Sequence, residues 1–338
     1  MEIRLHRDFS EIEPSQWDEL LSQSVTDVPF LRYGYLKQWW DFKGGGEWPQ
    51  NAQLCILSGW NGSELIGIAP FFSVMEDERE KVYLLGSIEI SDYLDLIARP
   101  GDAEEFIRSI LDYLDSKKEI GVSSLTLVNI PDQSPTNTLL QKIAPEFGWT
   151  VKVENAYHTP AIPLAADWNS YLAGIDKKQR HEIRRKLRRA DESAEVKLYF
   201  ADDPANLDGE INAFFDLMVL DEDKDKFLTA QMRDQMRAII HWAFDAGYLQ
   251  LSFLTIESFK AAGYLCFDYN GHILVYNSGF DFRFSQYSPG WVLLGYLIQN
   301  AIENKNLFFD FMRGDEDYKY RFGAINRFVM RAKVIKIS

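Results

Sequence analysis

The sequence predicts an α/β (α+β) protein with two similar domains in tandem, each a mixed central sheet flanked by helices. A chain of 338 residues, 46% of them hydrophobic, is long for one domain and can fill two cores. Strand and helix patterns alternate along its length. Two stretches, LCILSGWNGSELIGIAPFF and LSFLTIESFKAAGYLCFDY, are faintly alike, and each is followed by strand, helix and strand in the same order. This order predicts a degenerate tandem repeat.

Composition narrows the range of ligands and compartments. Lys and Arg number 36 against 51 Asp and Glu, so the net charge is −15. A field of this sign repels nucleic acid and anionic membranes, so an anionic ligand must meet a local basic site. Cys55 and Cys266 lie in apolar runs and are expected as buried free thiols, not as a disulfide or a zinc site. Because the sequence shows no leader-like start and no apolar run of about 18 residues, we expect a cytoplasmic protein without a membrane span.

The first half, residues 1–165, is predicted to form one domain. Asn61-Gly62 between two apolar runs is a strong hairpin signal. Apolar alternation and short apolar runs predict strands at residues 2–6, 53–60, 63–72, 82–85, 125–128 and 150–153. Helical periodicity predicts helices at residues 33–42, 103–114 and 137–143. Pro160 and Pro163 mark the joint with the second domain, residues 166–338.

The second half opens with a strongly basic helix, predicted at residues 171–190. Between residues 177 and 189 it carries eight Lys or Arg residues against one Glu. Arg180, Arg184 and Arg188 fall on one ridge, where like charges four residues apart repel each other. Such a ridge either docks on carboxylates of the same protein or meets an anionic ligand, and the sequence leaves both open.

The rest of the second half is predicted to alternate between helices and strands. Strands are expected at residues 196–200, 249–256, 262–269, 273–277 and 307–312, and helices at residues 204–220 and 230–246. The charged join LDEDKDKF between the two helices is expected to be solvated. A further helix after Pro289 is apolar on nearly every side, as is typical of a buried helix.

Three stretches of the second half carry a resemblance to a known family. They read YLAGIDKKQRHEIRRKLRRAD, YNSGFDFRFSQYSPGWVLL and FDFMRGDEDYKYRFG. In order and spacing they resemble the GNAT-type acetyltransferases associated with bacterial cellulose biosynthesis, which are related to the FemABX-like peptidyltransferases. The resemblance implies two tandem GNAT-like domains. It also implies an N-acyltransferase that moves an acyl group, acetyl first of all, from acyl-CoA to an amine on a sugar or a polysaccharide or cell-envelope precursor.

Acyl transfer from a thioester needs a phosphate site, a donor to the developing oxyanion and a group that moves protons. Ser288-Pro289-Gly290 supplies a helix N-terminus, where unpaired N–H groups suit a phosphate, although it can also be a plain helix start. The corresponding GNAT loop is Q/R-x-x-G-x-G/A, and the single glycine here leaves another activated acyl donor open. The residues expected to bind the donor are Ser278, Arg283, Ser288, Gly290, Arg180 and Arg184.

The catalytic candidates follow from the same chemistry. The resemblance implies that a backbone N–H near Asn277 and Ser278 polarises the thioester carbonyl. Asp310 lies among phenylalanines and can be either a base or a structural ion-pair partner, with Asp281 and Glu316 as other carboxylates. Tyr318 can be the acid that meets the leaving thiolate, or a packing residue. Lys319 and Arg321 are expected to contact an anion. The catalytic candidates of first choice are therefore Asp310, Tyr318, Lys319 and Asn277.

Two further functions stay open beside the acyl-CoA reaction. One is a FemABX-like transfer of an aminoacyl group from charged tRNA, for which the basic helix is a local landing site despite the net charge. The other is a non-catalytic GNAT-like scaffold that binds an anionic ligand or a protein partner. The sequence contains no HExxH, P-loop or GxSxG motif, so neither a metal site nor a serine triad is expected.

Overall fold

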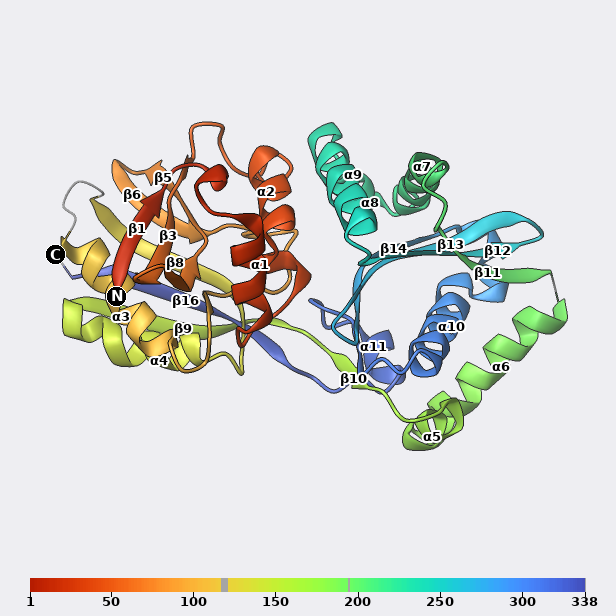
Figure 1. Cartoon of the computed structure of the whole chain (residues 1–338). Helices are drawn as coiled ribbons and strands as arrows, with labels where there is room; N and C mark the ends of the chain where they lie inside the picture. The colour runs from red at the N-terminus through yellow and green to blue at the C-terminus, as the bar shows by residue number, and fades with distance from the viewer. Residues whose placement is uncertain (117–120, 194, 338) are drawn as a thin grey trace. The chain divides into compact units, whose positions relative to one another are not determined.

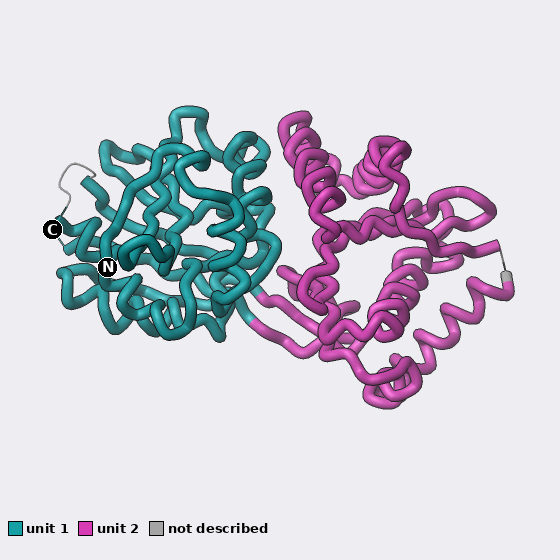
Figure 2. Tube along the Cα trace, viewed as in Figure 1, with its two compact units in different colours: residues 1–157, 328–338 teal, residues 158–327 magenta. Residues whose placement is uncertain are grey.

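The computed structural model describes residues 1–116, 121–193 and 195–337 and divides into two compact units (Figure 2). Unit 1 comprises Met1–Tyr157 together with the C-terminal segment from Phe328, and unit 2 comprises His158–Arg327. The last strand therefore returns to the first unit, where its blue ribbon lies among red to yellow elements (Figure 1). The sequence predicts the domain boundary between residues 165 and 166, later than the observed boundary between Tyr157 and His158. It also places the last strand in the second domain, whereas the structure has it in unit 1.

Unit 1 holds two sheets and the helices that cover them. Its helices are α1 (Pro14–Ser22), α2 (Tyr33–Asp41), α3 (Ala103–Ser116) and α4 (Pro135–Ile143). Its strands are β1 (Glu2–His6), β2 (Gln53–Leu54), β3 (Ile56–Asn61), β4 (Glu64–Ala69), β5 (Phe71–Glu76), β6 (Arg79–Leu84), β7 (Ile97–Ala98), β8 (Val122–Pro131), β9 (Trp149–His158) and β16 (Phe328–Lys336). The strand orders are β1-β3-β4-β7 and β2-β5-β6-β8-β16-β9.

The predicted hairpin at Asn61-Gly62 is confirmed, because β3 and β4 pair antiparallel across it. Both predicted strands nevertheless break, and their outer parts, β2 and β5, belong to the second sheet. The breaks fall at Cys55, whose N–H donates to the Phe71 carbonyl, and at Pro70, which has no N–H to donate. A hydrophobic run alone does not show on which sheet each part of it pairs.

Unit 2 is organised round one mixed sheet with the order β10-β15-β14-β13-β12-β11. The strands are β10 (Ala161–Pro163), β11 (Val196–Phe200), β12 (Leu249–Ile256), β13 (Phe259–Tyr269), β14 (His272–Phe280) and β15 (Phe308–Asp310). The helices are α5 (Trp168–Gly174), α6 (Lys177–Ser193), α7 (Leu207–Met218), α8 (Glu222–Phe227), α9 (Ala230–Asp245), α10 (Pro289–Glu303) and α11 (Asp317–Arg321). Helices α7 and α9 cover one face of the sheet, and α10 with α6 covers the other (Figure 1).

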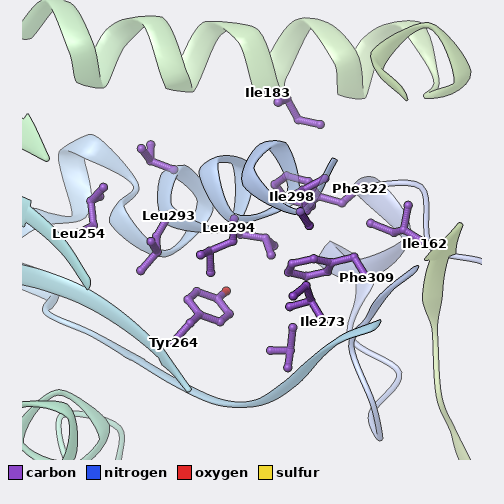
Figure 3. Close-up of a cluster of buried hydrophobic side chains, with 14 of the residues drawn as sticks. Ile162, Ile183, Leu254, Tyr264, Ile273, Leu293, Leu294, Ile298, Phe309 and Phe322 are labelled. Carbon is purple, nitrogen blue, oxygen red and sulfur yellow. The ribbon is translucent and has the colours of Figure 1, made fainter. Parts of the chain in front are cut away.

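The core of unit 2 lies between the sheet and α10 (Figure 3). Nine residues of α10 are buried, which confirms that this helix is internal. Ile183 of α6 is fully buried and points at α10 (Figure 3). At Gly295 an added Cβ would lie 3.1 Å from Leu187 Cδ2, so the glycine allows α6 to pack closely on α10. This packing leaves four arginines of α6 exposed: Arg184, Arg185, Arg188 and Arg189.

One local prediction in unit 2 is wrong. The basic helix is two helices, because α5 ends at Gly174 and the Asp176 carboxylate accepts the N–H groups of Lys178 and Gln179 to start α6. The charged join after α7 is mostly exposed, as expected, and it forms the short helix α8, in which Lys224 is half-buried. Both cysteines are buried free thiols, as expected. No helix in the described part of the chain is long and apolar enough to cross a membrane.

Candidate functional site

The site begins where two parallel strands separate. β14 pairs with β15 only from His272 to Leu274, yet it continues to Phe280. The register of β14 against β13 shifts by one residue at Tyr276, a bulge that bends a strand and increases its twist. On the other side Phe311 N–H donates to the Pro160 carbonyl, which turns the chain towards β10. The edge of β14 beyond Leu274 is therefore left open by β15.

A cavity of about 530 Å³ lies at this opening. It collects side chains from β13, β14, α8, α10, α11 and the loop between β14 and α10, and most of its surface is aromatic or aliphatic. Its lining is Lys224, Tyr264, Ser278, Phe280, Phe282, Ser285, Ser288, Pro289, Gly290, Trp291, Leu294, Glu316 and Tyr318. A cleft with an apolar wall and a few polar groups is the usual form of a small-molecule site.

One end of the cavity is closed by the first turn of α10. Ser288 precedes Pro289 as the N-cap, as predicted, but it adopts a left-handed conformation (φ 54°) and its side chain makes no capping hydrogen bond. The N–H of Val292 bonds to the Ser288 carbonyl, and those of Gly290 and Trp291 precede the first intrahelical bond. A Cβ at Gly290 would be 3.5 Å from Phe280, an ordinary contact, so packing alone does not require glycine there.

The charged residues of the lining are Lys224 and Glu316. The Lys224 ammonium donates to the Ser278 carbonyl and lies 3.4 Å from Ser278 Oγ. Burial lowers the pKa of Lys224, and the charges of Asp221 and Glu316 oppose that shift. A cation is thus fixed beside the open edge of β14, the position at which the resemblance implies a donor to the thioester carbonyl.

Glu316 is held in place by Lys319 and Gly314. Lys319 is buried and donates to the carbonyls of Phe311, Arg313 and Gly314, and its ammonium lies 2.9 Å from Glu316 Oε2. Gly314 has φ 121°, and a Cβ there would lie 2.3 Å from Glu316 Oε2 and 2.7 Å from Lys319 Nζ. Lys319 was expected to contact an anion of a ligand. Its ammonium is instead saturated by the protein and acts as the support of Glu316.

Two tyrosines point polar groups into the cavity. Within the described residues, neither the Tyr264 nor the Tyr318 hydroxyl has a hydrogen-bond partner, although Tyr264 is only 6% exposed. Burial raises the pKa of Tyr318, and the Glu316 charge adds to the rise. Burial also raises the pKa of Tyr264, with the Tyr318 hydroxyl as the next contribution. Both hydroxyls therefore carry their protons at neutral pH and can donate hydrogen bonds to a ligand.

The structure brings only some of the predicted residues together. Ser278, Ser288, Gly290 and Tyr318 line the cavity, and Arg180, Arg184, Arg283, Asn277, Asp310 and Lys319 do not. A backbone N–H near Asn277 and Ser278 was expected to polarise the thioester carbonyl, and the Ser278 N–H donates instead to Asn277 Oδ1 at 2.8 Å.

The arginines and Asp310 have other contacts. Arg283 is 80% exposed and ion-paired with the buried Asp281, whose pKa it lowers mainly through their hydrogen bonds. Asp310 Oδ1 accepts the Met312 N–H, which holds the turn after β15. Arg180 lies over the carbonyls of Leu172 and Ala173 at the end of α5, and Arg184 is exposed on α6. The predicted meeting of these two arginines with the α10 N-terminus does not occur in the cavity.

No sequence pattern predicted that Lys224, Tyr264 and Trp291 belong to the site. Lys224 stands in a run of alternating acids and lysines, where no spacing distinguishes it from its neighbours. Tyr264 faces Ser278 in the register of β13 against β14, and only the pairing of those strands reveals this. Trp291 could have been noticed as an aromatic residue in the first turn of the buried helix. No group of three His, Cys, Asp or Glu side chains within the described residues could hold a metal ion.

Comparisons with known proteins agree with this architecture. Residues 177–320, from α6 to α11, match the family model of an acetyltransferase (GNAT) domain. No curated protein matches the sequence. The structure of FemX superposes with a TM-score of 0.68 at 12% identity, covering 98% of this chain and 97% of FemX. L-PGS from Bacillus licheniformis gives a TM-score of 0.56 at 12% identity, covering 96% of this chain and 92% of L-PGS.

A tandem GNAT protein from the clavulanic acid biosynthesis pathway gives a TM-score of 0.50 at 11% identity, covering 98% of this chain and 97% of that protein. At such identities the solved structures bear on the fold alone. The predicted fold class, two tandem GNAT-like domains with mixed sheets flanked by helices, is confirmed. The segment that matches the GNAT acetyltransferase domain model, residues 177–320, contains the lining of the cavity.

Proposed function

We propose that this protein is an N-acyltransferase that moves an acyl group, acetyl first of all, from acyl-CoA to an amine acceptor. The observation that carries the proposal is the apolar cavity at the point where β14 leaves β15, inside the segment that matches the GNAT domain. A thioester arm needs such a slot, open along a strand edge and closed to water by aromatic walls.

The donor is proposed to lie along the open edge of β14 with its phosphates towards the first turn of α10. The N–H groups of Gly290 and Trp291, at the positive end of a 15-residue helix, suit a phosphate there. Phe280, Phe282 and Leu294 would contact the apolar arm. Lys224 would lie near the thioester carbonyl and stabilise the negative charge that develops on its oxygen.

In the reaction the acceptor nitrogen forms a bond to the carbonyl carbon, and the carbon–sulfur bond breaks. Glu316, the carboxylate of the lining, takes the proton that the nitrogen releases, and Lys319 positions it. Tyr318 donates a hydrogen bond to the leaving sulfur. Because its pKa is raised, full proton transfer to a thiolate would be uphill, so we assign stabilisation of the thiolate to Tyr318, with the proton coming from water.

The acceptor is proposed to be an amine on a sugar or on a polysaccharide or cell-envelope precursor. This part rests on the sequence motifs that resemble the cellulose-biosynthesis acetyltransferases. A second candidate is aminoacyl transfer from charged tRNA. The observation favouring it is the exposed basic face of α6, where Lys177, Arg184 and Arg189 have no ion-pair partner among the described residues.

A ligand panel separates these possibilities. Thermal unfolding is measured with acetyl-CoA, longer acyl-CoAs, free CoA and uncharged tRNA. A ligand at 100 times its dissociation constant should add about 2.7 kcal/mol to the free energy of unfolding. Stabilisation by an acyl-CoA supports the proposal, and stabilisation by tRNA alone supports the second candidate. If neither stabilises the protein, the non-catalytic scaffold is the better account.

A further inference from the structure

A basic groove lies on unit 2 outside the cavity. It measures about 580 Å³ and is lined by Lys178, Gln179, His181, Glu182, Arg185 and Arg321. Three cations from two separate helices, α6 and α11, thus surround one depression with one carboxylate, Glu182, in its wall. Arg321 is also ion-paired at 3.6 Å with Asp317, which does not line the groove. In a protein with a net charge of −15, this local excess of positive charge is the kind of feature that marks an anion site.

The Glu182 carboxylate orients the Arg185 guanidinium and does not neutralise the net positive charge of the groove. Glu182 accepts two hydrogen bonds from Arg185, from Nε at 2.9 Å and from Nη2 at 2.8 Å. The remaining guanidinium nitrogen, Nη1, has no bond within the described residues, and neither does the Lys178 ammonium. A guanidinium fixed in this way presents its free N–H groups to an anion at a low entropic cost.

The groove is linked to the cavity through a short chain of contacts. Lys186 lies 3.7 Å from Glu182 of the groove and stands 4.2 Å over the ring of Trp291, which lines the cavity. Arg321 of the groove and Tyr318 of the cavity lie on the same helix, α11. Burial lowers the pKa of Lys186, and the charges of Arg185 and Arg321 add to that effect while Glu182 opposes it. The excess positive charge thus extends to the wall shared with the cavity.

We propose that this groove binds the diphosphate, or a comparable polyphosphate group, of a small-molecule substrate whose reactive end lies in the cavity. The inference rests on the proposed function, because it assigns the groove to a substrate of that reaction. Acyl-CoA donors and activated sugar acceptors both contain such groups, and the groove chemistry is the same for either. A donor bound in the groove would have its diphosphate there instead of at the first turn of α10. A long polyanion is disfavoured, because the overall charge of the protein repels it and the groove is local.

Inorganic pyrophosphate is the direct probe. Its affinity is measured by calorimetry for wild type, Arg185→Ala, Arg321→Ala and Arg189→Ala, at low salt and at about 150 mM salt. Loss of one charge-assisted hydrogen bond should weaken binding about tenfold for each of the first two variants. Arg189 is an exposed arginine of α6 outside the groove and serves as the matched control, with less than about a twofold change expected. Thermal unfolding of each variant checks that it is folded.

Competition identifies the source of the phosphate. Displacement of pyrophosphate by coenzyme A assigns the groove to the donor, and displacement by uridine diphosphate assigns it to an activated acceptor. The proposal is overturned if wild type does not bind pyrophosphate, if neither compound competes, or if Arg189→Ala loses as much affinity as the groove variants. Tighter binding of a 20-nucleotide RNA than of pyrophosphate at 150 mM salt would assign the face to nucleic acid instead.

The activity of the same variants separates this inference from the proposed function. Arg185→Ala and Arg321→Ala should raise the KM of the phosphate-bearing substrate about tenfold and leave kcat unchanged, since neither side chain lines the cavity that holds the reacting atoms. Acyl transfer with unchanged KM in both variants would refute the groove and keep the proposed function. If the protein transfers no acyl group but binds pyrophosphate in a way that depends on Arg185 and Arg321, the groove is supported and the proposed function is refuted.

Discussion

Replacing Tyr318 by Phe removes one hydroxyl from the cavity and leaves almost everything else in place. The hydroxyl has no hydrogen-bond partner among the described residues, and the ring packs edge-to-face on Phe311 at 5.9 Å, a contact that Phe can keep. The free energy of unfolding should therefore change by less than about 0.5 kcal/mol. If the hydroxyl stabilises the leaving thiolate, its loss costs about 3 kcal/mol of barrier, which lowers kcat by roughly 100-fold.

The assay follows thiol release from acetyl-CoA in the presence of an amine acceptor, and KM should stay near the wild-type value. Tyr35→Phe is the matched control. Tyr35 is a buried tyrosine of unit 1 whose hydroxyl donates to the Ile90 carbonyl at 2.7 Å. Its removal should cost about 1–2 kcal/mol of stability and leave kcat unaltered. A Tyr318→Phe enzyme with wild-type kcat, or one that loses activity only because it unfolds, would refute the assignment of this hydroxyl.

Three further predictions concern the groups around Glu316 and Asp281. Glu316→Gln should lower kcat by roughly 100-fold at neutral pH. The loss should become smaller at higher pH, where the acceptor amine is deprotonated without a base. A loss of kcat that is constant with pH would contradict the role of Glu316 as the base. Gly314→Ala should cost about 1–3 kcal/mol of stability, because Gly314 has a φ of 121°. It should also reduce kcat, because the new Cβ would displace the Glu316 carboxylate. Wild-type activity together with a lowered Tm would show that Gly314 has a structural role only. Arg283→Ala should lower Tm at pH 7, because Arg283 holds the pKa of Asp281 below its usual value. That contribution exists above the unfolded-state pKa of about 4 and is lost as pH falls through the lower folded-state pKa, so equal Tm differences at pH 7 and pH 3 would contradict it.

Local patterns in the sequence were enough for elements whose contacts are local. The first strand and the strand at residues 196–200 follow from alternation and have the predicted bounds. The buried helix after Pro289 follows from its apolar surface. The break between α5 and α6 was missed because one capping carboxylate, Asp176, decides it against a continuous helical pattern.

The candidate site was only partly predictable, for a physical reason. Ser288, Gly290 and Tyr318 were found because short motifs place them at a helix start and on a small helix. Lys224 and Tyr264 reach the cavity through the pairing of β13 with β14 and the position of α8, which are long-range contacts. The return of β16 to unit 1 also depends on a long-range contact, because its partner strand β8 lies about two hundred residues earlier in the chain.

The central claim is that an acyl donor occupies the cavity between the open edge of β14 and the first turn of α10. Gly290→Trp tests it most directly, because the glycine lines the cavity and an added Cβ would make only an ordinary contact with Phe280, at 3.5 Å, so a large side chain would extend into the space proposed for the donor. Equilibrium dialysis with radiolabelled acetyl-CoA should show binding to wild type and a loss of at least about 50-fold in the variant, with an unchanged Tm. Equal binding of acetyl-CoA to a folded Gly290→Trp protein would contradict the account.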